Sequence, residues 1–185
     1  FSVTSDNSDL CLTTDPQDGS DGFLLKGMIG LADGLNNGFL HLPNQGYLRL
    51  SDVDIVTPAD IKSYNLTGIT CTEDKELYTI SFDCGGLPAV SCRFDEGKLC
   101  LTAQPIDLAF LFESPLFSDI SLEQIQQTAI YTMTLRSDLA IDGYQIVPTD
   151  NGFALQLKKH LISSGGLPLS GITVLLDAGH GGTAL

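Results

Sequence analysis

Short runs in which apolar and polar residues alternate recur along most of this chain, separated by residues typical of tight turns. In residues 76–83, Tyr78, Ile80 and Phe82 fall on one side of an extended chain, and the residues between them fall on the other. A period of two is the period of a β-strand that has one buried face. The turn residues between the runs, such as Asp150-Asn151-Gly152, are typical of antiparallel hairpins. The pattern predicts an all-β, antiparallel, sandwich-like module.

The same pattern places the individual strands. The four between residues 65 and 103 suggest an antiparallel meander. Residues 121–126 are read as a single helical turn capped by Ser121. Residues 65–103 and 128–159 share a rhythm of apolar strand, Gly-containing turn and alternating strand, which fits two related halves or a coincidence of β periodicity. The predicted strands cover residues 23–30, 38–42, 46–50, 65–72, 76–83, 87–94, 98–103, 128–136, 143–147 and 152–159.

Composition divides the chain into four segments. Residues 1–21 are polar and acidic and are expected to form a flexible leader. Residues 22–161 form the β-rich module, and the small residues of 162–171 are typical of a linker. Residues 172–185 begin a different domain. Within residues 38–50, leucines alternate with His41 and Arg49, which places His41 and Arg49 on the solvent side.

The final segment carries the most specific chemistry. Residues 172–176 form an apolar, β-branched run that leads directly into Asp177-Ala178-Gly179-His180-Gly181-Gly182. A histidine at the end of a buried strand is well placed to offer a ring nitrogen to a metal. The glycines allow close approach of a substrate, and Asp177 is placed to orient the histidine or hold the turn.

These residues resemble the opening of the catalytic domain of the zinc-dependent N-acetylmuramoyl-L-alanine amidases, the cell-wall amidase family. The resemblance covers residues 172–182 and fades at Thr183-Ala184-Leu185. It implies that His180 is the first zinc ligand and that the domain is of the α/β class, begun here by its truncated first strand. The family's other ligands and its catalytic glutamate lie farther along that domain. The full-length parent is therefore expected to use zinc, whereas this chain alone is expected to bind none and to be inactive.

Charge excludes several partners. The net charge is −14, from 23 acidic and 9 basic residues, and it argues against binding nucleic acid or adsorbing electrostatically to anionic wall polymers. No apolar run approaches 18 residues, so no membrane span is expected. The amidase resemblance implies export to the extracellular cell wall, with a signal peptide that is absent from this chain.

The five cysteines are Cys11, Cys71, Cys84, Cys92 and Cys100. An odd number excludes complete intramolecular pairing, and no Cys-x-x-Cys motif suggests a zinc knuckle. We expect buried thiols that act as small hydrophobic residues, with one cross-strand disulfide as the alternative.

Two functions fit the module. It could target the enzyme to peptidoglycan or muropeptides through an exposed polar and aromatic face bearing Tyr78, Tyr131 and Tyr144. Alternatively, it could be a regulatory or structural module that packs against the amidase domain and binds no glycan itself. A third reading, that the chain is itself an enzyme, finds no nucleophile and base at catalytic spacing in the sequence.

Overall fold

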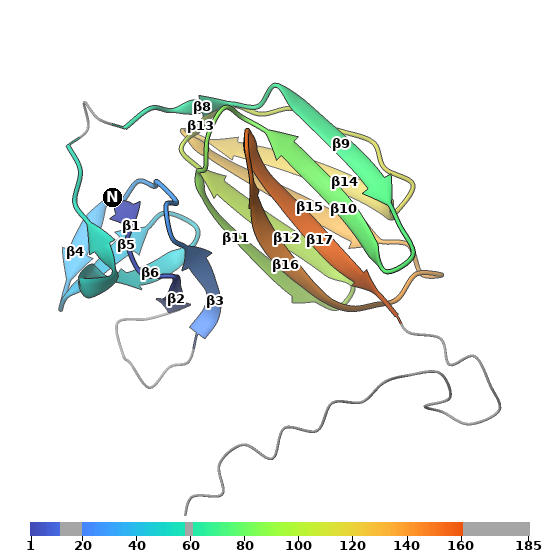
Figure 1. The fold of residues 1–185 in the computed structure, drawn as a ribbon, viewed down its shortest axis with the longest axis horizontal. Helices are drawn as coiled ribbons and strands as arrows, with labels where there is room; N and C mark the ends of the chain where they lie inside the picture. Colours follow the sequence, from blue (N-terminus) through green and yellow to red (C-terminus); the bar gives the residue numbers. More distant parts are fainter. Residues whose placement is uncertain (12–19, 58–60, 161–185) are drawn as a thin grey trace, which may run out of the picture.

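The computed structural model describes residues 1–11, 20–57 and 61–160, and within them it contains strands and one short 3-10 helix (Figure 1). The all-β prediction is confirmed. The strands are β1 (Ser2–Val3), β2 (Asn7–Cys11), β3 (Ser20–Leu25), β4 (Gly34–Asn36), β5 (Phe39–Leu42), β6 (Gly46–Arg49), β7 (Val53–Asp54), β8 (Tyr64–Asn65), β9 (Gly68–Glu73), β10 (Leu77–Asp83), β11 (Ala89–Asp95), β12 (Lys98–Gln104), β13 (Ile106–Leu108), β14 (Phe117–Ile125), β15 (Thr128–Leu135), β16 (Ile141–Thr149) and β17 (Gly152–Lys159); η1 spans Leu50–Asp52.

The first part of the chain forms an N-terminal sheet with the strand order β3-β2-β6-β5-β4, flanked by the short pair β1-β7. Leu40, Leu42 and Leu48 are buried in it and Arg49 is exposed, as their alternation predicts. The prediction of a flexible leader is wrong for the residues described here. Phe1, Val3 and Leu10 are buried, because these apolar side chains pack into the hydrophobic core.

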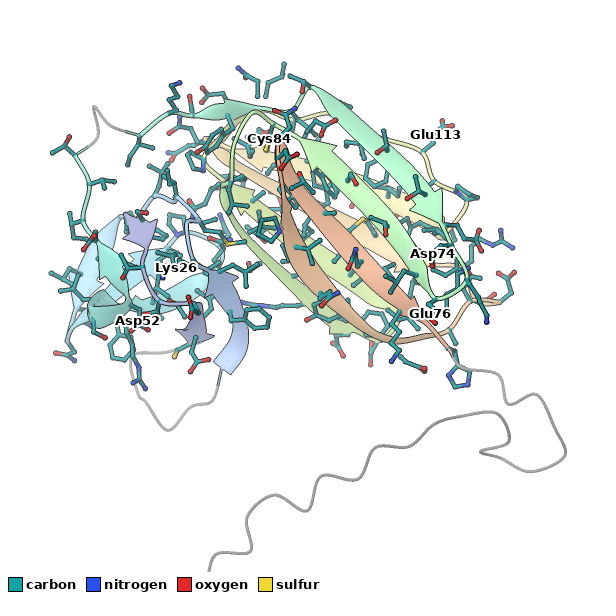
Figure 2. The ribbon with its side chains drawn as sticks, viewed as in Figure 1. Lys26, Asp52, Asp74, Glu76, Cys84 and Glu113 are labelled. Carbon is teal, nitrogen blue, oxygen red and sulfur yellow. The ribbon has the colours of Figure 1, made fainter. Side chains whose placement is uncertain are left out.

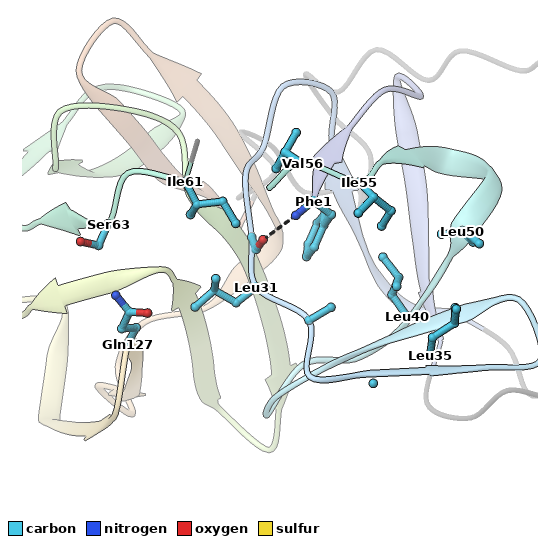
Figure 3. Close-up of a pocket in the computed structure, with 13 residues that line it drawn as sticks. Phe1, Leu31, Leu35, Leu40, Leu50, Ile55, Val56, Ile61, Ser63 and Gln127 are labelled. Atoms are coloured by element: carbon cyan, nitrogen blue, oxygen red, sulfur yellow. Dashed lines mark hydrogen bonds between the residues drawn. The ribbon is translucent and has the colours of Figure 1, made fainter. Parts of the chain in front are cut away.

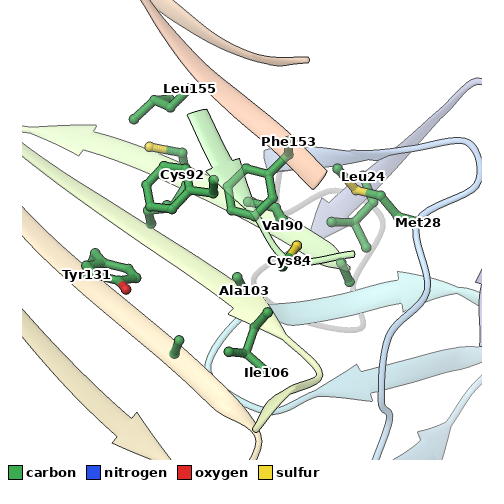
Figure 4. Packing of buried hydrophobic residues seen from close by; sticks show 14 of the residues in the cluster. Leu24, Met28, Cys84, Val90, Cys92, Ala103, Ile106, Tyr131, Phe153 and Leu155 are labelled. Atoms are coloured by element: carbon green, nitrogen blue, oxygen red, sulfur yellow. The ribbon is translucent and has the colours of Figure 1, made fainter. Parts of the chain in front are cut away.

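The second part is a sandwich of two four-stranded antiparallel sheets (Figure 1). The first sandwich sheet has the order β16-β17-β10-β9, and the second sandwich sheet has the order β11-β12-β15-β14. Their inner faces meet in an apolar core (Figure 4). Phe82 and Phe153 stack at 4.7 Å in the first sheet, and the Phe82 ring lies 5.8 Å from that of Tyr131 in the second.

The predicted meander over residues 65–103 is wrong at its centre. β9 pairs with β10 and β11 pairs with β12, but β10 and β11 belong to different sheets. The segment between them, which contains Gly85-Gly86, crosses the sandwich. Its first amides, those of Cys84 and Gly85, donate to the carbonyl of Asn151. The other side of β10 is occupied by β17, a non-local pairing that the local pattern cannot reveal.

The two halves of the sandwich have the same strand arrangement, and the second half begins at β14, before residue 128 where the sequence pattern placed its start. Each half gives one hairpin to each sheet: β9–β10 and β11–β12 from the first half, β14–β15 and β16–β17 from the second. Read from its β9 edge, the first sandwich sheet has the order β9-β10-β17-β16. Replacing each strand by its counterpart in the other half gives β14-β15-β12-β11, which is the order of the second sandwich sheet read from its β14 edge. The topology therefore has an approximate two-fold symmetry.

The predicted helical turn at residues 121–126 is also wrong. This segment lies in β14, which pairs with β15 in the second sandwich sheet. Ile120 and Leu122 pack against the core while Ser121 and Glu123 are exposed, so the alternation with a period of two determines the structure.

Candidate functional site

Two of the residues predicted to have functional roles, His180 and Asp177, lie outside the described residues, as do the predicted linker 162–171 and the amidase-like strand. The candidate zinc ligand therefore stays a prediction. Among the described residues, no group of three or more His, Cys, Asp or Glu side chains is placed to hold a metal ion. His41 contacts Asp33 at 2.5 Å, and His160 contacts Asp142 at 2.6 Å.

The three predicted tyrosines do not form one exposed face. Tyr131 is buried, and its hydroxyl donates to the carbonyl of Phe110 at 2.7 Å. Burial raises the pKa of Tyr131 to about 12, so Tyr131 is a core residue and its prediction as a surface ligand-binding residue is wrong. Tyr78 is half-buried, with the ammonium of Lys159 4.5 Å from its ring centroid. Tyr144 is partly exposed, and its hydroxyl donates to the carbonyl of Cys92.

The outer face of the second sandwich sheet is covered at one end by the N-terminal sheet. Gln45, in the turn between β5 and β6, inserts its side chain there and is only 1% exposed. Its Nε2 lies 3.3 Å from the carbonyl of Ala89, 3.1 Å from Ser91 Oγ and 3.2 Å from the carbonyl of Thr102. These contacts define the Gln45 socket, formed by Ala89, Ser91, Thr102 and Gln104.

The socket also recognises the oxygen and the main chain of Gln45. Gln104 Nε2 donates to Gln45 Oε1 at 2.8 Å and to the carbonyl of Leu31 at 3.2 Å. The Arg93 guanidinium donates to the main-chain carbonyl of Gln45 at 3.1 Å. Sequence reasoning missed this network because polar residues in alternating strands are expected to face solvent. The turn residues Pro43-Asn44-Gln45-Gly46 indicate a loop, but nothing in the sequence indicates that Gln45 is buried.

The outer face of the first sandwich sheet presents polar side chains. Thr79 and Ser81 in β10 lie beside Gln156 in β17, and Gln145 Nε2 donates to Gln156 Oε1 at 2.7 Å. A shallow hollow of about 220 Å³ lies next to this pair. It is lined by Leu77, Gly143, Tyr144, Gln145, Gln156 and Lys158.

A larger, apolar cleft of about 610 Å³ lies beside the N-terminal sheet (Figure 3). Leu31, Leu35 and Ile55 line it, and Ser63 and Gln127 contribute polar groups at the sandwich side. Leu35 is 63% exposed and Ile55 is 65% exposed, which is unusual for residues of this size. The cleft is therefore suited to apolar contact with another protein surface.

The charged side chains are spread over the periphery. Asp74, Glu76 and Glu113 lie at the part of the sandwich remote from the N-terminal sheet (Figure 2). The carboxylate of Asp74 accepts hydrogen bonds from the amides of Glu76 and Leu77, which lower its pKa. The Asp74 carboxylate therefore caps a local turn, and in the part of the chain that the structure describes no group of three or more acidic, His or Cys side chains is placed to hold a metal ion.

Burial raises the pKa of the Cys92 thiol to about 12, so at neutral pH this sulfur is protonated and a poor nucleophile. The candidate binding features of the described residues are the polar hollow and the apolar cleft. Comparison of this chain with protein-family models, with curated proteins and with solved structures finds no match in any of the three.

Proposed function

We propose that this chain is the non-catalytic N-terminal region of a peptidoglycan-hydrolysing N-acetylmuramoyl-L-alanine amidase, and that its sandwich holds the enzyme on the cell wall. The observation that carries this proposal is the order of parts. An all-β module with an uncovered polar face precedes Asp177-Ala178-Gly179-His180-Gly181-Gly182, the segment that resembles the amidase opening.

The parent enzyme would work outside the cytoplasmic membrane, where its substrate lies. Its zinc, with His180 as one ligand, would polarise the amide carbonyl between N-acetylmuramic acid and L-alanine and activate water. Within residues 1–11, 20–57 and 61–160, no group of three or more His, Cys, Asp or Glu side chains is placed to hold a metal ion. The role of the described residues is to bring the enzyme to an insoluble substrate.

The outer face of the first sandwich sheet is the proposed wall contact. With a net charge of −14, the chain is repelled by anionic wall polymers, so the contact has to rely on hydrogen bonds. Gln145, Gln156 and Thr79 supply donors and acceptors on the outer face of this sheet, and Lys158 supplies a cation. Within the described chain no helix is long and apolar enough to cross a membrane.

A pull-down with purified insoluble peptidoglycan tests the proposal. The full chain is expected to sediment with the polymer at about 0.15 M salt and to stay bound at about 0.5 M, because charge attraction contributes little. Cellulose of the same particle size is the control surface. Equal recovery on both polymers, or recovery on neither, would contradict wall targeting.

The apolar cleft favours a second candidate, a regulatory or structural module that packs against the amidase domain. Leu35 and Ile55 would lie under that domain, and the chain would bind no glycan itself. Hydrolysis of a soluble muropeptide distinguishes the two. A regulatory module changes the rate of the catalytic domain on soluble substrate, whereas a targeting module changes the rate on insoluble wall only.

A further inference from the structure

The approximate two-fold symmetry of the sandwich relates the Gln45 socket to the polar hollow on the first sandwich sheet. Exchanging the halves maps β11 onto β16 and β12 onto β17. The β11–β12 hairpin closes with the pair Asp95 and Lys98, and the β16–β17 hairpin closes with Thr149 and Gly152. Lys98 is therefore aligned with Gly152. From there the register gives the equivalent residues: Ala89 corresponds to Gly143, Ser91 to Gln145, Thr102 to Gln156 and Gln104 to Lys158.

The cross-strand pairs agree with this alignment. Ala89 pairs with Gln104, and Gly143 pairs with Lys158. Likewise, Ser91 pairs with Thr102, and Gln145 pairs with Gln156. All four residues of the Gln45 socket therefore have their equivalents in the lining of the hollow. The socket contains a glutamine side chain from the N-terminal sheet, whereas the hollow is open.

The side chains that line the hollow can form hydrogen bonds to an amide group like that of Gln45. Gln145 Nε2 donates a hydrogen bond to Gln156 Oε1. The other two amide atoms, the acceptor Gln145 Oε1 and the donor Gln156 Nε2, have no hydrogen-bond partner among the described residues. Lys158 occupies the place of Gln104, whose Nε2 donates to the amide oxygen of Gln45, and its exposed ammonium can make the same donation. Gly143 leaves space at the floor, since a Cβ built there has no atom within 4 Å.

We infer that the hollow is an open counterpart of the Gln45 socket and binds an amide group presented by a peptide. The amide oxygen accepts from Lys158 and Gln156, and the amide N–H donates to Gln145 Oε1. We take the amide to be a peptide's, because the group bound in the occupied socket is the side-chain amide of a residue in a peptide turn. The source of the peptide rests on the proposed function: the amide-bearing stem peptide of peptidoglycan.

The chain's own turn supplies a probe that does not depend on peptidoglycan. A synthetic hexapeptide with the sequence of residues 42–47, Leu-Pro-Asn-Gln-Gly-Tyr, is titrated into the ¹⁵N-labelled full chain, and amide shifts are followed by NMR. The socket is occupied by Gln45, so shifts are expected around Gly143 and Gln156. The same peptide with alanine in place of glutamine is expected to bind about tenfold more weakly, because it lacks the glutamine side-chain amide and keeps only the shorter one of asparagine.

Two variants locate the binding. Gly143→Phe fills the hollow and is expected to abolish the shifts, while an unchanged melting temperature shows that the sandwich is intact. Lys158→Gln is expected to weaken binding about fivefold, because it loses a charged donor. Lys98→Gln removes an exposed lysine from the outer face of the other sheet and should change nothing. Shifts centred on the Gln45 socket, or shifts that persist in Gly143→Phe, would overturn the inference.

A titration with soluble stem peptide distinguishes wall targeting from amide binding in the hollow. Saturable shifts of residues in the hollow support both proposals. Binding of the hexapeptide without binding of stem peptide or wall keeps the amide site and rejects the peptidoglycan source. Wall binding that is unchanged in Gly143→Phe keeps wall targeting and rejects this site. Shifts on an N-acetylated sugar oligomer but on neither peptide would also reject it.

Discussion

The side-chain amide of Gln104 donates to Oε1 of Gln45 at 2.8 Å, across the boundary between the sandwich and the N-terminal sheet. Both residues are only 1% exposed. Because each glutamine amide carries both donors and an acceptor, the two side chains can satisfy one another's hydrogen bonds without burying a charge. The free-energy cost of burying these polar groups is therefore small. This hydrogen bond joins the N-terminal sheet to the outer face of the second sandwich sheet, whereas the N-terminal sheet makes no such contact with the outer face of the first among the described residues.

Gln45→Ala is expected to destabilise the chain by about 2 kcal/mol, because it leaves the buried Gln104 and Ser91 without this partner. Urea unfolding measures the free energy. Gln145→Ala, which removes a glutamine side chain from the open hollow, is the control and should stay within about 0.5 kcal/mol of the parent chain. An equal loss in both variants would show that the network does not stabilise the boundary.

Tyr131→Phe tests the reassignment of this tyrosine to the core. Removing the hydroxyl leaves the Phe110 carbonyl without its donor, with an expected loss of about 1 kcal/mol. Retention on peptidoglycan should not change, since the ring and its packing against Phe82 remain. A variant with full stability but lost retention would restore Tyr131 as a surface binding residue.

Gly152→Ala is expected to disrupt the pairing of β10 with β17. A Cβ at Gly152 would lie 2.0 Å from the carbonyl oxygen of Phe82, so the two strands must separate. We expect a loss of roughly 2–3 kcal/mol, measured as a lower melting temperature. Gly143→Ala is the matched control, since the added methyl group meets open space and should be neutral. Equal melting temperatures for the two variants would contradict this packing.

Thiol reactivity should follow burial. Cys71 is exposed, whereas Cys84 and Cys92 are buried and their pKa values are raised, to about 11 and about 12. With iodoacetamide at pH 8, mass spectrometry is expected to find Cys71 alkylated first and Cys92 only after unfolding. The five cysteines are free in the structure, so the prediction of buried thiols holds for Cys11, Cys84 and Cys92 but not for Cys71. A cysteine pair that resists alkylation until a reductant is added would indicate the disulfide alternative.

Local periodicity determined much of this fold. The alternation of Tyr78, Ile80 and Phe82 with polar neighbours predicted a strand and its buried face, because strand geometry depends on adjacent residues only. The same reasoning failed at residues 121–126, where the capping signal at Ser121 was weaker than the alternation around Leu122. It also failed at Gly85-Gly86, where a turn signal cannot distinguish a hairpin from a crossing between sheets.

The sequence by itself determined the fold class and most strands and turns, and it contains the segment of residues 172–182 that resembles the amidase opening. The tertiary structure alone decided that β10 pairs with β17 and that Tyr131 belongs to the core. It also decided that Gln45 is buried while Gln145 and Gln156 are accessible. The physical reason is that burial of a polar side chain depends on which distant surface packs over it, and non-local packing leaves no periodic signal in the chain.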